Sequence, residues 1–336
     1  MPFAQPTYTR VTLKDVARKV GVSVNAASKV LNNTRSSGQV SEETRKRILE
    51  VAKELGYQPN SAARSLVRRR SDIIAMYFDV EYLDVAEPFT AALIEGAERG
   101  CRERNQSLLL YTRGNDTSPD DTCRKLLSGT ADGIVIASWS DQEVIARLIA
   151  AGIPVVHYPT PHPDLPSLLI DERSAAKQAI DLLKSKGHTR VLYHHFHWIA
   201  TTRPDMYVAA GKEVGVEVTI VRSEDSYGHL NEEACRILAK PRDQRPTAIA
   251  CWNDEFAYRV LDYCHDAGLS VPGDVAVVGF DGAHTFPTPR QILTTVIIPW
   301  SDLAMTAVCS LVDIRDGKTV PKQAVLPVTL QIGDTV

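Results

Sequence analysis

The sequence predicts a small all-α module at the N-terminus, followed by an α/β body of two Rossmann-like subdomains. Residues 1–72 carry 14 Lys and Arg residues against 6 Asp and Glu residues, whereas the rest of the chain carries 24 and 35. The first part contains three short amphipathic helical patterns, and the second contains two rounds of apolar strands that alternate with helices. A basic module joined to an acidic body indicates a polyanionic partner for the N-terminal module alone.

The first two helices form a helix-turn-helix pattern. Thr12 and Asp15 make a capping-box-like start, and apolar residues at 13, 16, 17 and 20 share one helical face. Gly21 breaks this helix, and Ser23 caps a second helix that ends near residue 32. Two short helices joined by a tight glycine turn are typical of a unit whose second helix enters the major groove of DNA. The residues expected to point outward from the second helix are Val24, Asn25, Ser28 and Lys29.

A third helix completes the module, and a linker follows it. Ser41 caps this helix, apolar residues at 48, 51, 52 and 55 form its buried stripe, and Gly56 ends it. Pro59 stops the helix, and Asn60 can cap a new segment that is too short to be stable alone. We therefore predict a DNA-binding domain over residues 1–58. Residues 59–72 are then either a solvated linker or a helix that folds on DNA.

From residue 73 the pattern changes to that of a doubly wound body. Apolar strands that alternate with helices are typical of a parallel sheet, whose ligands bind at the carboxyl ends of the strands. Two rounds of this pattern predict two subdomains with a cleft between them. The expected strands are 73–78, 108–111, 133–138, 155–158, 191–194, 216–221, 248–252 and 275–278, and the expected helices are 89–104, 120–127, 141–150, 174–186, 204–214, 231–238 and 255–267.

Motifs for catalysis, cofactors and metals are missing from the sequence. It has no G-x-G-x-x-G after the first strand of the body, no Walker motif and no G-x-S-x-G. The six cysteines form no C-x-x-C pair, and the alternating His195 and His197 have no further ligands nearby. The sequence also has no apolar signal region and no apolar run of about 18 residues. We expect no enzymatic activity, no cofactor, no metal and no membrane span, and a cytoplasmic, nucleoid-associated location.

A series of ordered motifs runs along nearly the whole chain. Together these motifs resemble the LacI/GalR family of bacterial repressors. The resemblance implies a repressor with a periplasmic-binding-protein-like body, controlled by a small molecule, a sugar, that binds between the subdomains. The motifs are Val11-Thr12-Leu13-Lys14-Asp15-Val16-Ala17, Gly21-Val22-Ser23, Ser28-Lys29-Val30-Leu31-Asn32, Val40-Ser41-Glu42-Glu43-Thr44-Arg45, Leu55-Gly56-Tyr57-Gln58-Pro59-Asn60, Lys186-Gly187-His188-Thr189-Arg190-Val191, Cys251-Trp252-Asn253-Asp254, Val278-Gly279-Phe280-Asp281 and Leu293-Thr294-Thr295-Val296.

The resemblance also implies DNA contacts. Val24, Asn25 and Lys29 would face base edges, where Asn25 suits adenine and Lys29 suits guanine. The family usually has arginine where Lys29 stands, and the loop over residues 33–39 is longer than usual, so the operator sequence does not carry over. In a hinge helix that begins at Asn60, Leu66 would be the minor-groove wedge, with Ala63 close to the groove floor. The phosphate contacts would be Thr12, Ser23, Asn32, Ser41, Thr44 and Tyr57.

In the body, the resemblance implies that the chain recrosses near residue 293. The first subdomain would then hold residues 73–170 and 293–317, and the second residues 171–292 and 318–336. Asp281 would accept hydrogen bonds from sugar hydroxyls, and Arg203 stands where the family has a ligand-binding arginine. The other candidate ligand residues are Asp171, Trp252 and Asn253, together with Tyr82, Phe89 and Trp139, which follow strands of the first subdomain.

Two further expectations concern assembly and alternatives. The C-terminal residues 330–336 show no heptad pattern, so a homodimer is favoured over a larger oligomer. The alternative function is a solute-binding protein or an enzyme that uses the same double fold without binding DNA. The basic first 72 residues and the missing signal region disfavour both.

Overall fold

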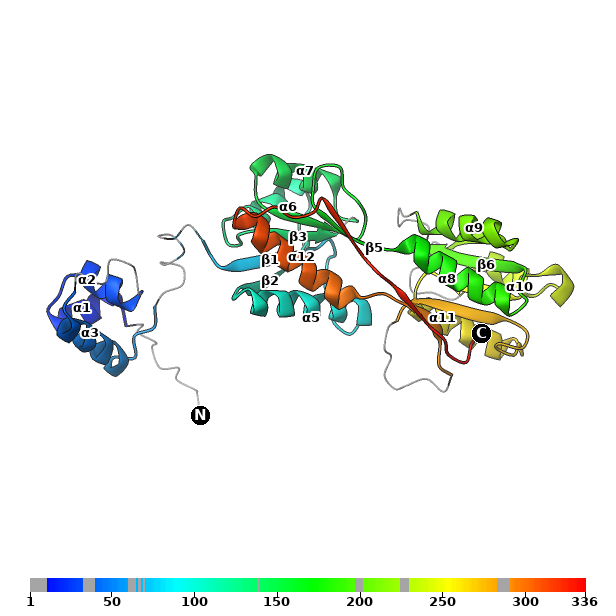
Figure 1. The fold of residues 1–336 in the computed structure, drawn as a ribbon, viewed down its shortest axis with the longest axis horizontal. Coiled ribbons are helices and arrows are strands. Elements are labelled where there is room, and N and C mark those ends of the chain that lie inside the picture. The colour runs from blue at the N-terminus through cyan, green and yellow to red at the C-terminus, as the bar shows by residue number, and fades with distance from the viewer. Residues whose placement is uncertain are drawn as a thin grey trace. The chain divides into compact units, whose positions relative to one another are not determined.

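Contacts divide the chain into two units, residues 1–71 and 72–336, and each unit is described by itself. The computed structural model describes residues 11–32, 40–59, 65, 68, 70–137, 139–196, 202–223, 230–282 and 291–336. Figure 1 labels the helices and strands of both units. None of the helices in these ranges is both long enough and apolar enough to span a membrane.

The first unit contains the three predicted helices, α1 (Leu13–Val20), α2 (Val24–Leu31) and α3 (Glu42–Glu54). Thr12 and Asp15 form a complete capping box, in which the Asp15 carboxylate accepts from the backbone N–H of Thr12 at 2.9 Å. Gly21 ends α1 with a left-handed φ of 78°, a conformation that favours glycine. The helix-turn-helix prediction is therefore confirmed. The core of this unit consists of Val16, Ala17, Val20, Ala27, Val30, Ile48 and Ala52.

The first sheet of the second unit is parallel, with the strand order β11-β5-β4-β3-β1-β2. Helices α5 and α12 cover one face and α6 and α7 the other (Figure 1), so alternate residues of β1 enter two different core clusters. We call this sheet and its helices the first lobe. Its elements are β1 (Ile73–Phe78), α5 (Pro88–Glu103), β2 (Ser107–Thr112), α6 (Pro119–Leu126), β3 (Ile134–Ala137), α7 (Gln142–Ala151), β4 (Val155–Tyr158), β5 (Ser167–Ile170), α12 (Trp300–Arg315) and β11 (Gln323–Leu326).

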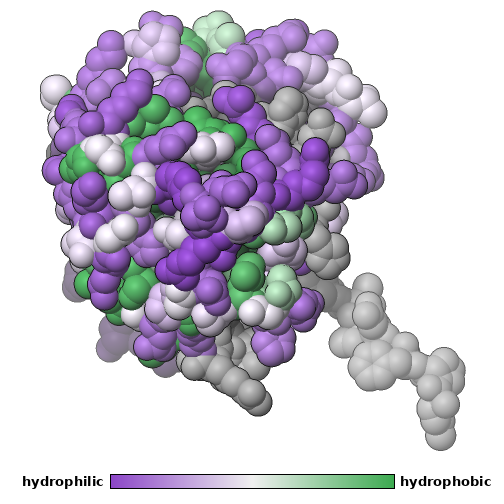
Figure 2. Space-filling view, turned by 90° about the vertical axis from the view of Figure 1, so that its right-hand side faces the viewer, coloured by the Kyte–Doolittle hydropathy of each residue, from purple (hydrophilic) through white to green (hydrophobic). Residues whose placement is uncertain are grey.

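The second sheet has the order β12-β10-β9-β8-β6-β7, and only β12 runs antiparallel to its neighbour. We call this sheet and its helices the second lobe. Seen from the right-hand side of Figure 1, the surface is mainly hydrophilic with small separate hydrophobic groups (Figure 2). The elements are α8 (Glu172–Ser185), β6 (Arg190–Phe196), α9 (Arg203–Val214), β7 (Glu217–Ser223), α10 (Glu232–Leu238), the 3-10 turn η2 (Arg242–Gln244), β8 (Ala248–Cys251), α11 (Asp254–Asp266), β9 (Ala276–Asp281), β10 (Thr294–Ile297) and β12 (Thr329–Gln331).

Two predicted boundaries within the body are corrected by the strand pairing. Most of the segment 293–317, helix α12, packs against α5 in the first lobe, as predicted for the first subdomain, but its strand β10 pairs with β9 in the second lobe. The strand β12 of the segment 318–336 pairs with β10 in the second lobe, as predicted for the second subdomain, but its strand β11 pairs with β5 in the first lobe. The chain therefore crosses after β5, after β10 and after β11. β10 pairs with the strand that precedes it, whereas β11 pairs with β5, which lies far away in the sequence and which local patterns do not reveal.

Helices α5 and α12 approach each other closely through two glycines of α5. A Cβ atom on Gly96 would overlap the backbone oxygen of Ser301, and a Cβ atom on Gly100 would lie 2.9 Å from the backbone oxygen of Met305. No side chain from α5 separates the two backbones at these points. The two helices therefore have no room to approach more closely at these points.

We expect Gly96→Ala to destabilise the second unit by roughly 1–3 kcal/mol, because the added methyl group overlaps the backbone of α12. Helix propensity alone would predict the opposite sign, a gain of about 1 kcal/mol. Urea unfolding followed by circular dichroism measures the difference. Glu98→Ala, at an exposed position of the same helix, is the control and should change stability little. A more stable Gly96→Ala protein would contradict the close approach.

Candidate functional sites

The outward face of α2 in the first unit carries the four residues predicted to approach DNA. Val24 is 42% exposed and Asn25 is also exposed, whereas Ser28 and Lys29 are half-buried. Ala27 and Val30, on the opposite face, are buried in the core. The packing of this face fixes the direction in which α2 presents its outward residues.

Three of the predicted phosphate contacts also cap the N-termini of helices. Thr12, Ser23 and Ser41 are the N-caps of α1, α2 and α3, and each hydroxyl accepts from a backbone N–H in the first turn of its helix. The side-chain N–H of Asn32 donates to Ser28 Oγ at 3.1 Å. Thr44 and Tyr57 are half-buried. Asn60, Ala63 and Leu66, predicted for the hinge, lie outside the described residues, as does the loop 33–39.

A cavity of about 580 Å³ in the second unit is lined by residues from both lobes. The first lobe contributes the segment that connects β1 to α5, and the second lobe contributes the end of β9 and one face of α11. The cavity therefore lies beyond the carboxyl ends of parallel strands, as predicted. Phe89, Asn253 and Asp281, three of the predicted ligand residues, line it. The other lining residues are Asp84, Ala86, Glu87, Pro88, Glu255, Tyr258, Arg259 and Asp262.

Asp281 stands at the end of β9 with a left-handed φ of 110°, a strained conformation for this residue type. Its Oδ1 accepts from the indole N–H of Trp300 at 3.0 Å. Burial, followed by the neighbouring Asp254 carboxylate, raises the pKa of Asp281 well above its ordinary value, and the Arg203 charge lowers it by less. A ligand that donates hydrogen bonds to Asp281 would stabilise the ionised form of this carboxyl group.

Arg203 is almost fully buried and has several protein partners. Its Nε donates to Glu172 at 3.1 Å, and another guanidinium N–H donates to the carbonyl oxygen of Trp252 at 3.0 Å. The guanidinium also lies 4.0 Å from the ring centroid of Trp252 and 3.6 Å from that of Phe280. These contacts hold Arg203 and Trp252 together behind the cavity, and neither residue lines it.

Other predicted ligand residues make contacts within the protein, as helix caps or as part of an aromatic pair. The Asn253 side chain caps α11 by accepting from the Phe256 N–H at 2.8 Å, while Asp171 caps α8. The Trp139 ring lies 6.1 Å from the ring of Phe89. Tyr82 is 79% exposed and is not among the lining residues. The structure thus brings Trp139 beside the cavity and leaves Tyr82 outside it.

Most of the polar lining was not predicted from the sequence. Glu255, Tyr258, Arg259 and Asp262 recur at the spacing i, i+3, i+4, i+7, so they share one face of α11. That spacing, directly after the Asn-Asp motif, was the available signal. Trp300 was also missed, although it donates to Asp281 and packs edge-on against Phe89 with the ring centroids 4.8 Å apart.

The described histidines, cysteines and carboxylates include no group of three that could hold a metal ion. The His194 ring is buried and stacks on Phe256 at 3.7 Å, and the His195 ring lies 5.0 Å from the Trp252 ring. Burial lowers the pKa of His194 to about 3, so this imidazole stays neutral. His197 lies outside the described residues.

Comparison with known proteins places this arrangement in a family. Residues 12–60 match the bacterial regulatory proteins of the lacI family, and residues 180–336 match a periplasmic binding protein-like domain. The HTH-type transcriptional repressor PurR of Photobacterium profundum is 31% identical over 312 residues, which cover 88% of this chain and 90% of that protein. Catabolite control protein A of Priestia megaterium is 28% identical over 331 residues, covering 94% and 96%. The chain belongs to the LacI family of transcriptional regulators.

The fold of the whole chain agrees with this assignment. A lac repressor dimer solved with its operator and the anti-inducer ONPF superposes with a TM-score of 0.83 at 22% identity, covering 97% of this chain and 99% of that one. The helical head and the two-lobed α/β body predicted from the sequence are therefore confirmed as a LacI-like fold.

We expect Asp281→Asn to raise the melting temperature of the ligand-free second unit, and more so at about pH 7 than at about pH 4. Because the folded-state pKa of Asp281 is raised, the unfolded chain releases this proton at a lower pH than the folded protein does. Stability from this group is therefore lost as the pH rises above the unfolded pKa, and asparagine removes that loss. Differential scanning calorimetry across this pH range measures it.

The control for this prediction is Asp262→Asn, which removes a carboxylate from an exposed position of the same cavity. It should not reproduce the pH-dependent gain. A lower melting temperature for Asp281→Asn at about pH 7 would contradict the environment described for Asp281.

Proposed function

We propose that this protein is a homodimeric, DNA-binding transcriptional repressor whose operator affinity is controlled by a sugar bound in the cavity between the lobes. The observation that carries the proposal is a cavity lined from both lobes in a chain whose separate first unit presents an exposed recognition helix. A ligand held by both lobes favours one arrangement of the lobes over another, and such differential binding is what allostery requires. The lac repressor structure, a dimer with operator and anti-inducer, supports this by analogy.

In this proposal α2 reads the operator from the major groove. Asn25 and Lys29 contact base edges, and Val24 contributes an apolar contact. The capped starts of the three helices lie against phosphates, with Thr12, Ser23 and Ser41 beside the backbone N–H groups there. Two copies bound to a pseudo-palindromic site would double this interface. Such a regulator acts on DNA in the cytoplasm and needs no catalytic group.

The cavity lining supports a sugar as the effector. Carboxylate and amide groups of Asp281, Asn253 and Glu87 suit the hydroxyl groups of a sugar, and Phe89, with Trp139 beside it, provides an aromatic surface for a sugar face. A few polar groups that fix orientation beside an aromatic wall are typical of a small-molecule site.

We expect Lys29→Ala to weaken binding to a selected operator duplex by about 1–3 kcal/mol, because one base contact is lost. Fluorescence anisotropy with a duplex selected from a randomised pool measures the change. Lys53→Ala removes the same charge from an exposed position near the end of α3 and is the matched control. Equal losses for the two variants would show that Lys29 contributes charge alone.

We expect Asp281→Ala to abolish the response to sugars while operator affinity without sugar is unchanged. Thermal-shift measurements with D-glucose, D-galactose and cellobiose as probes identify a stabilising sugar, and operator titrations with and without it measure the response. Asp164→Ala, an exposed carboxylate outside the cavity lining, is the control and should respond normally. A normal response from Asp281→Ala would refute the assigned site, and no stabilisation by any of these sugars would count against a sugar effector.

A further inference from the structure

One end of helix α12 contacts the cavity wall. Trp300, its first residue, is 6% exposed, and its indole N–H donates to Asp281 Oδ1 at 3.0 Å. The same ring packs edge-on against Phe89 at 4.8 Å. Both Asp281 and Phe89 line the cavity, and they come from different lobes. A ligand that bonds to Asp281 or displaces Phe89 therefore acts directly on the start of α12.

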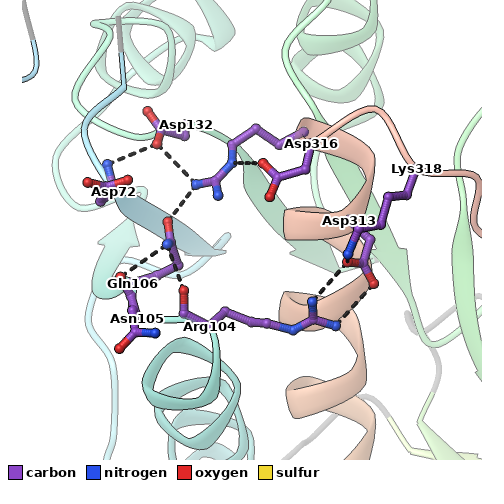
Figure 3. Close-up of polar contacts among 9 residues, drawn as sticks. Asp72, Arg104, Asn105, Gln106, Asp132, Asp313, Asp316 and Lys318 are labelled. Carbon is purple, nitrogen blue, oxygen red and sulfur yellow. Dashed lines mark hydrogen bonds and ion pairs between the residues drawn. The ribbon is translucent and has the colours of Figure 1, made fainter. Parts of the chain in front are cut away.

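The other end of α12 is held in a polar cluster (Figure 3). Arg315, its last residue, donates from one terminal nitrogen to Gln106 Oε1 at 2.5 Å and to Asp132 Oδ2 at 3.2 Å, and its Nε donates to Asp316 at 3.1 Å. The side chains of Arg315 and Asp132 are each only 10% exposed. Breaking a pair at such a depth leaves an uncompensated charge, so the cluster has a strongly preferred arrangement.

Asp132 connects this cluster to the point where the second unit begins. The same Oδ2 atom that faces Arg315 accepts from the backbone N–H of Asp72 at 2.9 Å (Figure 3). Asp72 is the first residue of the second unit, and its φ of 56° is left-handed. Its carbonyl oxygen accepts from the Ser107 N–H at 2.8 Å. These contacts fix the direction of the backbone where the predicted linker 59–72 meets β1.

α12 itself is suited to transmit a displacement. Its 16 residues span about 24 Å at the rise of an α-helix. Its backbone packs directly against that of α5 at Gly96 and Gly100. A rigid element held at both ends has few arrangements available, which is the property that coupling between two sites needs.

We propose that α12 couples the cavity to the linker, with Trp300 and Arg315 as the positioning residues at its two ends. This inference rests on the proposed function, because it names the path between the effector cavity and the DNA-binding unit. Neither residue touches DNA in this proposal. Trp300 couples α12 to Asp281, and Arg315 couples α12 through Asp132 to Asp72.

Coupling between two sites is reciprocal, so it can be tested from the DNA side without an effector. The experiment is hydrogen exchange with mass spectrometry on the full chain, with and without a duplex selected from a randomised pool. In the unmodified protein we expect the duplex to change amide exchange by about fivefold or more in β9 and in the first turn of α12. In Arg315→Met both changes should be lost, while the duplex is still bound.

Two variants make the result specific. Arg104→Met is the matched control, because it removes a two-bond ion pair to Asp313 of the same helix without touching Asp132 or Asp72, and it should keep both changes. Trp300→Phe keeps an aromatic ring but lacks the N–H that bonds to Asp281, so it should keep the change in α12 and lose the change in β9. If Arg315→Met does not fold, Trp300→Phe and Arg104→Met still decide the outcome.

The possible results separate the two proposals. Changes in β9 that persist in Arg315→Met or Trp300→Phe would overturn the role of α12, as would an equal loss in Arg104→Met. If the unmodified protein bound the duplex without any change in the exchange of β9, the role of α12 would also be overturned, while the proposed DNA binding would stand. Failure to select any duplex would instead contradict the proposed function on which the inference rests.

Discussion

Three chain crossings join the two sheets of the second unit, and the position of the cavity depends on them. All three leave the carboxyl ends of strands, namely β5, β10 and β11. At the first of these crossings, the backbone N–H of Asp171 donates to the carbonyl oxygen of Leu326 at 3.1 Å, so two crossing segments are also bonded to each other. The crossings hold the carboxyl edges of the two sheets toward each other. That is the edge at which parallel sheets bind ligands.

The polar residues of the cavity are positioned before any ligand arrives. Thr90 donates to Glu87 at 2.9 Å, Arg259 donates to Glu255 at 2.8 Å, and Trp300 donates to Asp281. Each of these partners restricts the rotamers of a carboxylate that faces the cavity, which lowers the entropy lost on binding. Positioning carboxylates so close together has an electrostatic cost, because Asp281 lies near Asp254 as well. A ligand rich in hydrogen-bond donors offsets that cost on binding, so the complex is more stable than the ligand-free protein.

The sequence was sufficient to predict the features that depend on local chemistry. The helices of the first unit follow from caps such as Thr12 and Ser23 and from periodic apolar residues, and the alternation of strands with helices predicts both sheets. The lobes to which β10 and β11 belong could not be predicted from local patterns, because strand pairing decides them: β10 pairs with β9 and β12, and β11 pairs with β5, more than a hundred residues earlier. In the cavity, Asp281 was identified from the family resemblance, through the motif Val278-Gly279-Phe280-Asp281. The charged face of α11 was missed, because exposed charges on a helix ordinarily face solvent.

The helix caps of the first unit have a practical consequence for changing its DNA specificity. Thr12, Ser23 and Ser41 each satisfy backbone N–H groups at a helix start, so replacing them alters folding as well as any phosphate contact. A random search for variants that no longer bind DNA will therefore return many that are simply less folded. Residues such as Val24 and Asn25 have exposed side chains without such a cap function. A library that varies the exposed positions of α2 and keeps the three hydroxyls would change sequence preference on an intact scaffold.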